Sequence, residues 1–189
     1  QHGPEGFYRG PLAEAVLASL DGWMSAQDLA SYRVRWRPPL SMDWRGGRLH
    51  TVSSPSAGGL QLLQMLGLME RRGSPSQSLE DNSHWLAEAM RISFRDRCQS
   101  AGDPDFQGPD PEPYLSKEWF EDWSNQMALE STLQLTGPTL AYSTGGTASH
   151  AVASADGGVV VITESLNHWF GSFIVPNGTG ILLNNIMDD

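Results

Sequence analysis

The stretch TGGTASHAVASADGGVVVITESLNH (residues 144–168) decides how the C-terminal part of this chain folds. Apolar residues, many of them β-branched, fill two segments that flank Asp156-Gly157-Gly158, and this tripeptide has the composition of a tight turn. We therefore predict a β-hairpin with strands at 151–155 and 159–164. A glycine pair and a threonine, Gly145-Gly146-Thr147, lead into its first strand.

The Gly-Gly-Thr step suits an enzyme that cuts itself before Thr147. A threonine hydroxyl becomes a useful nucleophile only when a base takes its proton, and a terminal α-amine, with a pKa of about 7.7–8.0, can be that base. Because Thr147 is internal, its hydroxyl would first have to attack the carbonyl of Gly146 and release a new N-terminus. The two glycines permit backbone angles that other residues resist. The alternative is a simple loop before a strand, and these residues alone leave both interpretations open.

The first two thirds of the chain have mainly helical patterns. Apolar spacing and capping residues predict helices at 12–20, 25–30, 60–69, 79–98 and 116–127. In the second of these, Ser25 is expected to be the N-cap and Asp28 to complete a capping box. Two strands are expected within 34–52 around Gly46-Gly47, a proline-rich loop at 104–113, and a polar irregular linker at 129–144. The predicted fold class is therefore α+β, with a helix-rich first part and strands at the C-terminal end.

Composition excludes several classes of partner. The chain has 189 residues, 39% of them hydrophobic, and a net charge of −10. This length suffices for one domain with a core, and the negative charge argues against nucleic acid or an anionic membrane as partner. No apolar run is long enough to predict a membrane span, and any signal peptide is expected upstream of Gln1.

Other constellations do not predict a metal site or a cofactor. His84 and Glu88 have a helical spacing that can bind zinc, but a third ligand is not evident, so a surface hydrogen bond or ion pair is expected. The serine-rich stretch 53–59 lacks the pattern of a serine nucleophile and is expected to start the helix at Leu60.

From Thr147 to Asp189 the sequence resembles the start of the small subunit of γ-glutamyltranspeptidase. The matching motifs are Thr147-Ala148-Ser149-His150, Asp156-Gly157, Ser165-Leu166-Asn167, Phe170-Gly171 and GILLNNIMDD at 180–189. The first 130 residues are similar to the C-terminal part of the family's large subunit, in EGFYRG (5–10), SSPSAGG (53–59), EAMR (88–91) and GDPDF (102–106). The resemblance implies a fragment of an αββα four-layer sandwich, the fold of N-terminal-nucleophile hydrolases. It divides the chain into residues 1–146, the end of the large-subunit region with its processing linker, and 147–189, the start of the small-subunit region.

The resemblance also implies roles for individual residues. Thr147 would be the nucleophile, in self-cleavage at Gly146–Thr147 and in acyl transfer, and Ser165 would hydrogen-bond it. Asn167 and Asp189 would grip the amino-acid end of a γ-glutamyl group. The chain departs from the family at Ala148, Ser149 and Ile186. The family's histidine two places after the nucleophile is replaced by Ser149, and His150 should lie on the opposite face of the strand.

The function implied is γ-glutamyl transfer or hydrolysis, acting on glutathione and γ-glutamyl amides, with no metal or organic cofactor. The expected partners are a small γ-glutamyl substrate and the rest of the large and small subunits, in a periplasmic or secreted location. Family features expected upstream of Gln1 and beyond Asp189 are missing, so the chain should be a partial one that is inactive alone. Two alternatives remain: a cephalosporin- or glutaryl-type acylase of the same superfamily, and a non-catalytic, unprocessed relative.

Overall fold

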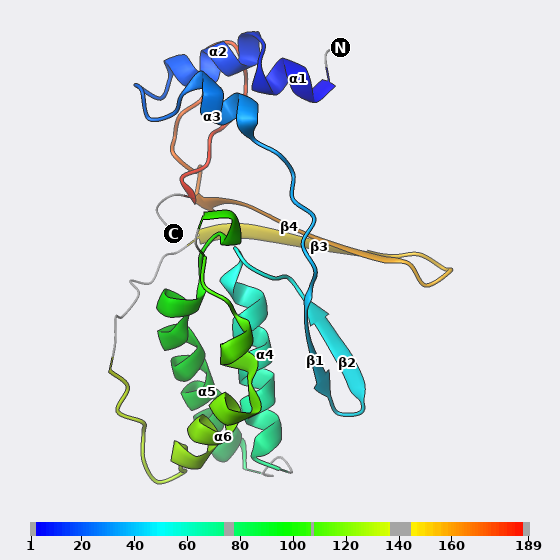
Figure 1. Ribbon diagram of the computed structural model, residues 1–189, viewed down its shortest axis with the longest axis vertical. Coiled ribbons are helices and arrows are strands. Elements are labelled where there is room, and N and C mark those ends of the chain that lie inside the picture. Colours follow the sequence, from blue (N-terminus) through cyan, green and yellow to red (C-terminus); the bar gives the residue numbers. More distant parts are fainter. Residues whose placement is uncertain (1–2, 74–77, 107, 137–144, 187–189) are drawn as a thin grey trace. The chain divides into compact units, whose positions relative to one another are not determined.

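The computed structural model describes residues 3–73, 78–106, 108–136 and 145–186 (Figure 1). The chain forms two compact units, one from residues 1–35 together with 142–189 and the other from residues 36–141. Helices dominate the first part, and the strands β3 and β4 come at the C-terminal end. The predicted α+β class is confirmed.

Three short helices open the first unit: α1 (Gly3–Tyr8), α2 (Pro11–Ala18) and α3 (Ala26–Ser31). The predicted capping box of α3 is confirmed. The Ser25 hydroxyl accepts the Asp28 N–H at 3.1 Å, and the Asp28 carboxylate accepts the Ser25 N–H at 2.8 Å. The Ser25 hydroxyl also donates to the Asp28 carboxylate at 2.7 Å, and this bond, followed by the one from the Ser25 N–H, lowers the pKa of Asp28 below its ordinary value. Helix α1 was not predicted from the sequence.

The C-terminal hairpin consists of β3 (Gly145–Ala153) and β4 (Val159–His168), which pair antiparallel (Figure 1). The loop at residues 154–158 is closed by a hydrogen bond from the Ser154 N–H to the Gly158 carbonyl at 2.8 Å. The predicted hairpin is confirmed, although both strands are longer than expected at the end away from the turn. As a result, Gly146 and Thr147 lie within β3 instead of before it.

Three helices build the second unit: α4 (Ala57–Arg71), α5 (Leu79–Ser100) and α6 (Lys117–Gln126). Between α5 and α6 lie the two short 3-10 helices η1 (Pro104–Phe106) and η2 (Glu112–Leu115). The helices bury an apolar cluster whose members are Leu68, Ala89, Ile92, Phe120 and Met127. All three predicted helices of this region are confirmed. They were predictable because their apolar residues recur at the spacing that one helix face requires.

A second hairpin belongs to this unit, with β1 (Leu40–Trp44) and β2 (Gly47–Thr51). Its two-residue loop is Arg45-Gly46, with φ angles of 48° and 79°. Two successive positive φ angles are what a tight turn of matching twist requires. The turn therefore comes one residue earlier than the predicted Gly46-Gly47.

His84 and Glu88 have structural roles in the second unit. The His84 ring contacts the carbonyl oxygen of Ala128 at 2.8 Å. Glu88 is 2% exposed, pairs with Arg91 at 2.6 Å and accepts the Leu133 N–H at 2.9 Å. The expected surface contact is therefore wrong for Glu88, whose charge is buried but paired. In the part of the chain that the structure describes, no helix combines the length and the apolar composition needed to cross a bilayer.

Candidate active site

The proposed nucleophile lies opposite its expected partner. Thr147 and Ser165 are cross-strand neighbours in β3 and β4, and the Thr147 hydroxyl donates to Ser165 Oγ at 3.0 Å. Ser165 Oγ also accepts the backbone N–H of Asn167 at 2.8 Å. Thr147 is exposed to solvent. A hydroxyl held in this way has a fixed orientation, which a nucleophile needs before it can attack a defined carbonyl.

A β-bulge lies at the expected cleavage position. Gly145 pairs with His168 and Thr147 pairs with Ser165, so Gly146 alone faces two residues of β4, Leu166 and Asn167. Asn167 has a φ of 71°, in the left-handed region where asparagine is better tolerated than most residues, and it is 7% exposed. Bulges change the direction of side chains at the ends of sheets, and this one brings Asn167 next to the Gly146–Thr147 step.

The segment after β4 folds back onto the end of the hairpin. Asn185 donates its N–H to the Leu166 carbonyl at 3.2 Å, and Leu183 donates to the Ile174 carbonyl at 3.0 Å. Gly171, with a φ of 52°, allows a close approach, since a Cβ at this position would clash with the Leu183 carbonyl oxygen. The Gly-Ile-Leu-Leu-Asn-Asn motif therefore contacts the Ser165-Leu166-Asn167 motif.

The next pairs along the hairpin divide into two faces. Ser149 and Thr163 share a hydrogen bond of 3.0 Å on the face that carries Thr147. His150 lies on the other face, where its Nε2 is 3.3 Å from a carboxylate oxygen of Glu164. The prediction that His150 and Thr147 lie on opposite faces is confirmed, because side chains alternate along a strand.

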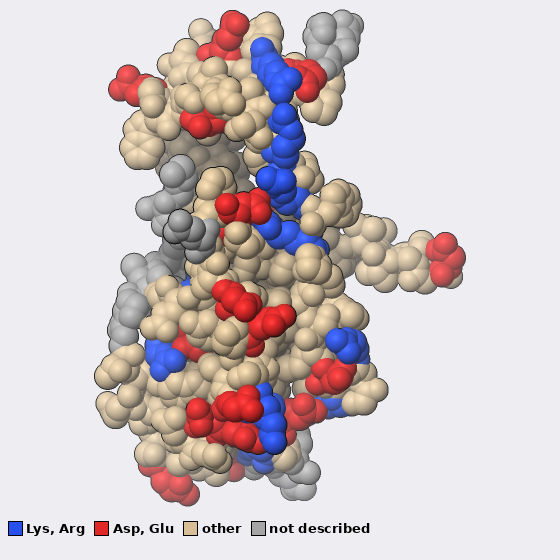
Figure 2. Space-filling model, in the orientation of Figure 1, with Lys and Arg blue, Asp and Glu red and all other residues tan. Residues whose placement is uncertain are grey.

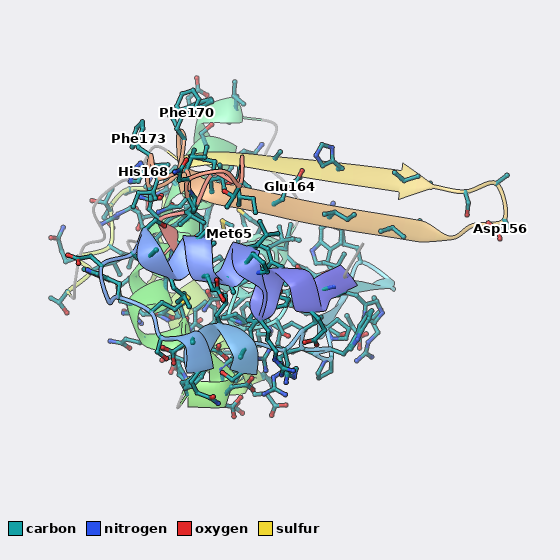
Figure 3. The ribbon with its side chains drawn as sticks, turned by 90° about the horizontal axis from the view of Figure 1, so that it is seen from above. Met65, Asp156, Glu164, His168, Phe170 and Phe173 are labelled. Atoms are coloured by element: carbon teal, nitrogen blue, oxygen red, sulfur yellow. The ribbon has the colours of Figure 1, made fainter. Side chains whose placement is uncertain are left out.

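The two ends of the hairpin differ in character. Figure 3 shows Asp156 at the turn, with His168, Phe170 and Phe173 at the other end. The Ser154 hydroxyl lowers the pKa of Asp156. Glu164 is the only Asp, Glu, Lys or Arg of β3 and β4, and Figure 2 shows the visible face of the hairpin as largely uncharged except near its tip.

Two of the expected features cannot be placed. Asp189 and residues 137–144 of the expected linker lie outside the described residues. The described portion of that linker, residues 129–136, contains no helix or strand apart from an isolated bridge between Ala128 and Ser131. Within residues 3–73, 78–106, 108–136 and 145–186, no three His, Cys, Asp or Glu side chains gather in a way that could hold a metal ion.

Sequence reasoning missed the bulge and the contacts of Asn185. The available signal was weak, because it consisted only of Asn167 being a residue type that accepts a positive φ. The contacts of Asn185 join residues 17 to 19 positions apart in the sequence and had no local signal.

Residues 1–189 match the protein-family model described as Gamma-glutamyltranspeptidase, so the chain belongs to that family. The architecture is accordingly part of the N-terminal-nucleophile hydrolase fold, as predicted.

Related proteins agree with this assignment. The chain is 37% identical over 198 residues to the glutathione hydrolase proenzyme of Pseudomonas aeruginosa, covering 99% of this chain and 35% of that protein. It is 32% identical to the glutathione hydrolase proenzyme of Escherichia coli, covering 100% of this chain and 34% of that protein. It is also 31% identical to the Acylase ACY 1 proenzyme of a Pseudomonas species (strain V22), covering 98% of this chain and 34% of that protein. The chain thus spans about a third of the length of these relatives.

Solved structures show the same fold. The gamma-glutamyltranspeptidase of Helicobacter pylori matches with a TM-score of 0.64 at 30% identity, over 71% of this chain and 41% of that chain. The gamma-glutamyltranspeptidase of Pseudomonas nitroreducens, complexed with L-DON, matches with a TM-score of 0.61 at 29% identity, over 69% of this chain and 41% of that chain.

Proposed function

We propose that this chain supplies the nucleophile and part of the substrate pocket of a γ-glutamyl transferase or hydrolase that matures by cutting itself before Thr147. The observation that carries the proposal is the 3.0 Å hydrogen bond from the Thr147 hydroxyl to Ser165 Oγ. Thr147 directly follows Gly146, the residue that lies opposite the bulge in β4. Family membership supports the same chemistry, since the relatives from Pseudomonas aeruginosa and Escherichia coli are named glutathione hydrolase proenzymes.

Self-cleavage begins with attack of Thr147 Oγ1 on the carbonyl carbon of Gly146. The C–N bond between the two residues breaks as the ester forms, and the hydroxyl proton ends on the threonine nitrogen. Water then hydrolyses the ester, which leaves a carboxylate on Gly146 and a free amine and hydroxyl on Thr147. Ser165 orients the hydroxyl in this sequence, while Gly146 gives the attack room because it has no side chain.

The matured Thr147 would then act on substrate. Its α-amine accepts the hydroxyl proton while Oγ1 attacks the γ-carbonyl of a γ-glutamyl amide, and the amine leaving group takes a proton as it departs. Water or an acceptor amine releases the γ-glutamyl group from the ester. Asn167 and Asp189 would bind the α-amino end, because a carboxylate and an amide oxygen both accept hydrogen bonds from an ammonium.

The remaining parts of this proposal concern the whole protein. Residues 1–146 and 147–189 would belong to the large and the small subunit, and both would act with the remainder of those subunits on a small γ-glutamyl substrate. The chemistry needs no metal or organic cofactor, because threonine supplies both nucleophile and base. A periplasmic or secreted location is proposed with it.

A glutaryl- or cephalosporin-type acylase is the second candidate. Ile186 favours it, because an apolar side chain, 44% exposed, lies in the segment that carries the substrate-binding motif. The similarity to Acylase ACY 1 proenzyme points the same way. Turnover of γ-glutamyl and glutaryl p-nitroanilides separates the two, since only the first carries an α-ammonium.

The decisive experiment is the intact mass of the full-length protein over time. We expect a cut between Gly146 and Thr147, no cut in Thr147→Ala, and cleavage retained in Thr147→Ser. Ser149→Ala is the matched control, because it removes a neighbouring hydroxyl from the same face of the same strand and should still be cleaved. Two fragments from Thr147→Ala would refute the proposal. An uncut but folded wild type would favour the non-catalytic relative.

A further inference from the structure

Three hydrogen bonds join Asn185 to three consecutive residues at the bulge of β4. Its N–H donates to the Leu166 carbonyl at 3.2 Å, its carbonyl accepts from Asn167 Nδ2 at 3.2 Å, and its side-chain Oδ1 accepts the His168 N–H at 3.1 Å. One residue therefore contacts the bulge on both sides of Asn167.

Asn167 needs such support. Its backbone lies in the left-handed region, which asparagine tolerates better than most residues but which is still disfavoured for a residue with a Cβ. A conformation of this kind persists only where the surroundings determine it. Within β4, the bond from the Asn167 N–H to Ser165 Oγ holds one side, and Asn185 holds the other.

The contacts also settle which end of the Asn167 amide is occupied. Its Nδ2 donates one of its two N–H groups to the Asn185 carbonyl, and this bond fixes the orientation of the amide. An amide oxygen accepts from an ammonium and cannot donate to a carboxylate.

We propose that Asn185 is a positioning residue for recognition of the substrate's α-amino group: it contacts no reacting atom but fixes the backbone and the amide orientation of Asn167. This inference rests on the proposed function. The side chain of Asn185 contributes one of the three bonds and its main chain the other two. Substitution should therefore weaken the placement of Asn167 rather than abolish it.

The test is kinetic, on the matured full-length enzyme, with γ-glutamyl p-nitroanilide and its des-amino counterpart glutaryl p-nitroanilide. Asn185→Ala should raise KM for the γ-glutamyl substrate about two- to tenfold, the range expected for one hydrogen bond, with kcat and the glutaryl KM little changed. Asn184→Ala is the matched control, since the side chain of the neighbouring Asn184 accepts the Ile186 N–H at 3.0 Å and, among the described residues, makes no hydrogen bond to Leu166, Asn167 or His168. It should leave both KM values within twofold of wild type.

Rescue separates positioning from bulk stability. Asn185→Asp keeps an oxygen that accepts the His168 N–H, so its γ-glutamyl KM should stay within twofold of wild type. If Asn185→Ala fails to mature, the KM of Asn185→Asp for the γ-glutamyl substrate tests the inference in its place. Equal KM increases for both anilides in Asn185→Ala, an equal effect of Asn184→Ala, or a tenfold loss in Asn185→Asp would each overturn the inference. If wild type is not cleaved or turns over neither anilide, the proposed function fails instead.

Discussion

Replacing Gly171 with alanine tests whether the fold-back of residues 180–186 onto β4 depends on one close backbone contact. Gly171 is buried, has a φ of 52°, and accepts no Cβ without displacing the Leu183 carbonyl or Asn184, whose Cα would be 3.0 Å away. The Leu183 carbonyl also accepts both the N–H and the hydroxyl of Ser172, each at 3.0 Å. A shift of that carbonyl would therefore disturb two hydrogen bonds as well.

The expected cost follows from these contacts. A left-handed alanine costs about 1–2 kcal/mol, and each disturbed hydrogen bond about 0.5–1.5 kcal/mol, which together give roughly 2–5 kcal/mol for Gly171→Ala. Gly178→Ala is the matched control: Gly178 has a φ of 74°, but a Cβ there would meet nothing within 4 Å. It should cost only the backbone term, about 1–2 kcal/mol.

Hydrogen exchange in the full-length protein measures the difference locally. A gap of about 1–3 kcal/mol corresponds to roughly 5- to 150-fold faster exchange at the Ser172 and Leu183 amides in Gly171→Ala than in Gly178→Ala. The reasoning is refuted if both variants open the segment equally, or if Gly171→Ala exchanges within twofold of wild type.

Two further predictions concern the helices and the hairpin turn. Leu63→Ala should lower the free energy of unfolding, measured by urea denaturation, by about 2–5 kcal/mol, because Leu63 is fully buried. Leu62 is 44% exposed, so Leu62→Ala should lower the free energy of unfolding clearly less. Equal losses in the two variants would contradict the packing. Ser154→Ala should raise the pKa of Asp156 toward that of a free aspartate, since the hydrogen bond from the Ser154 hydroxyl is the largest cause of the lowered pKa. An NMR titration of the Asp156 carboxyl that shows no rise in the variant would disprove this role of Ser154. Because the folded pKa is depressed, the turn is stabilised above about pH 3.9, where an unfolded aspartate titrates, and loses this stabilisation as the pH falls through the folded value.

Much of the secondary structure followed from local patterns. The Ser25–Asp28 capping box was predictable because both partners lie within one helical turn. The hairpin was predictable from its alternation and turn, and that turn also sets the register that places Thr147 opposite Ser165. Helix α1 was missed because its six residues carry little periodic signal.

The candidate site was predictable in its residues but only partly in its geometry. The resemblance assigned Thr147, Ser165 and Asn167, and the structure brings all three together at the start of the hairpin. The bulge opposite Gly146 had no signature that alternation could reveal, since it consists of one extra residue in β4.

The sequence by itself determined the family, most of the helices and strands, and the order of the motifs, because these depend on residue types at short spacing. Only the tertiary structure decided the positive φ of Asn167, the burial of Glu88, and the hydrogen bonds that join Asn185 to the bulge. Those features arise when distant segments close on each other, and the free energy of that closure is shared among contacts that no short stretch of sequence contains.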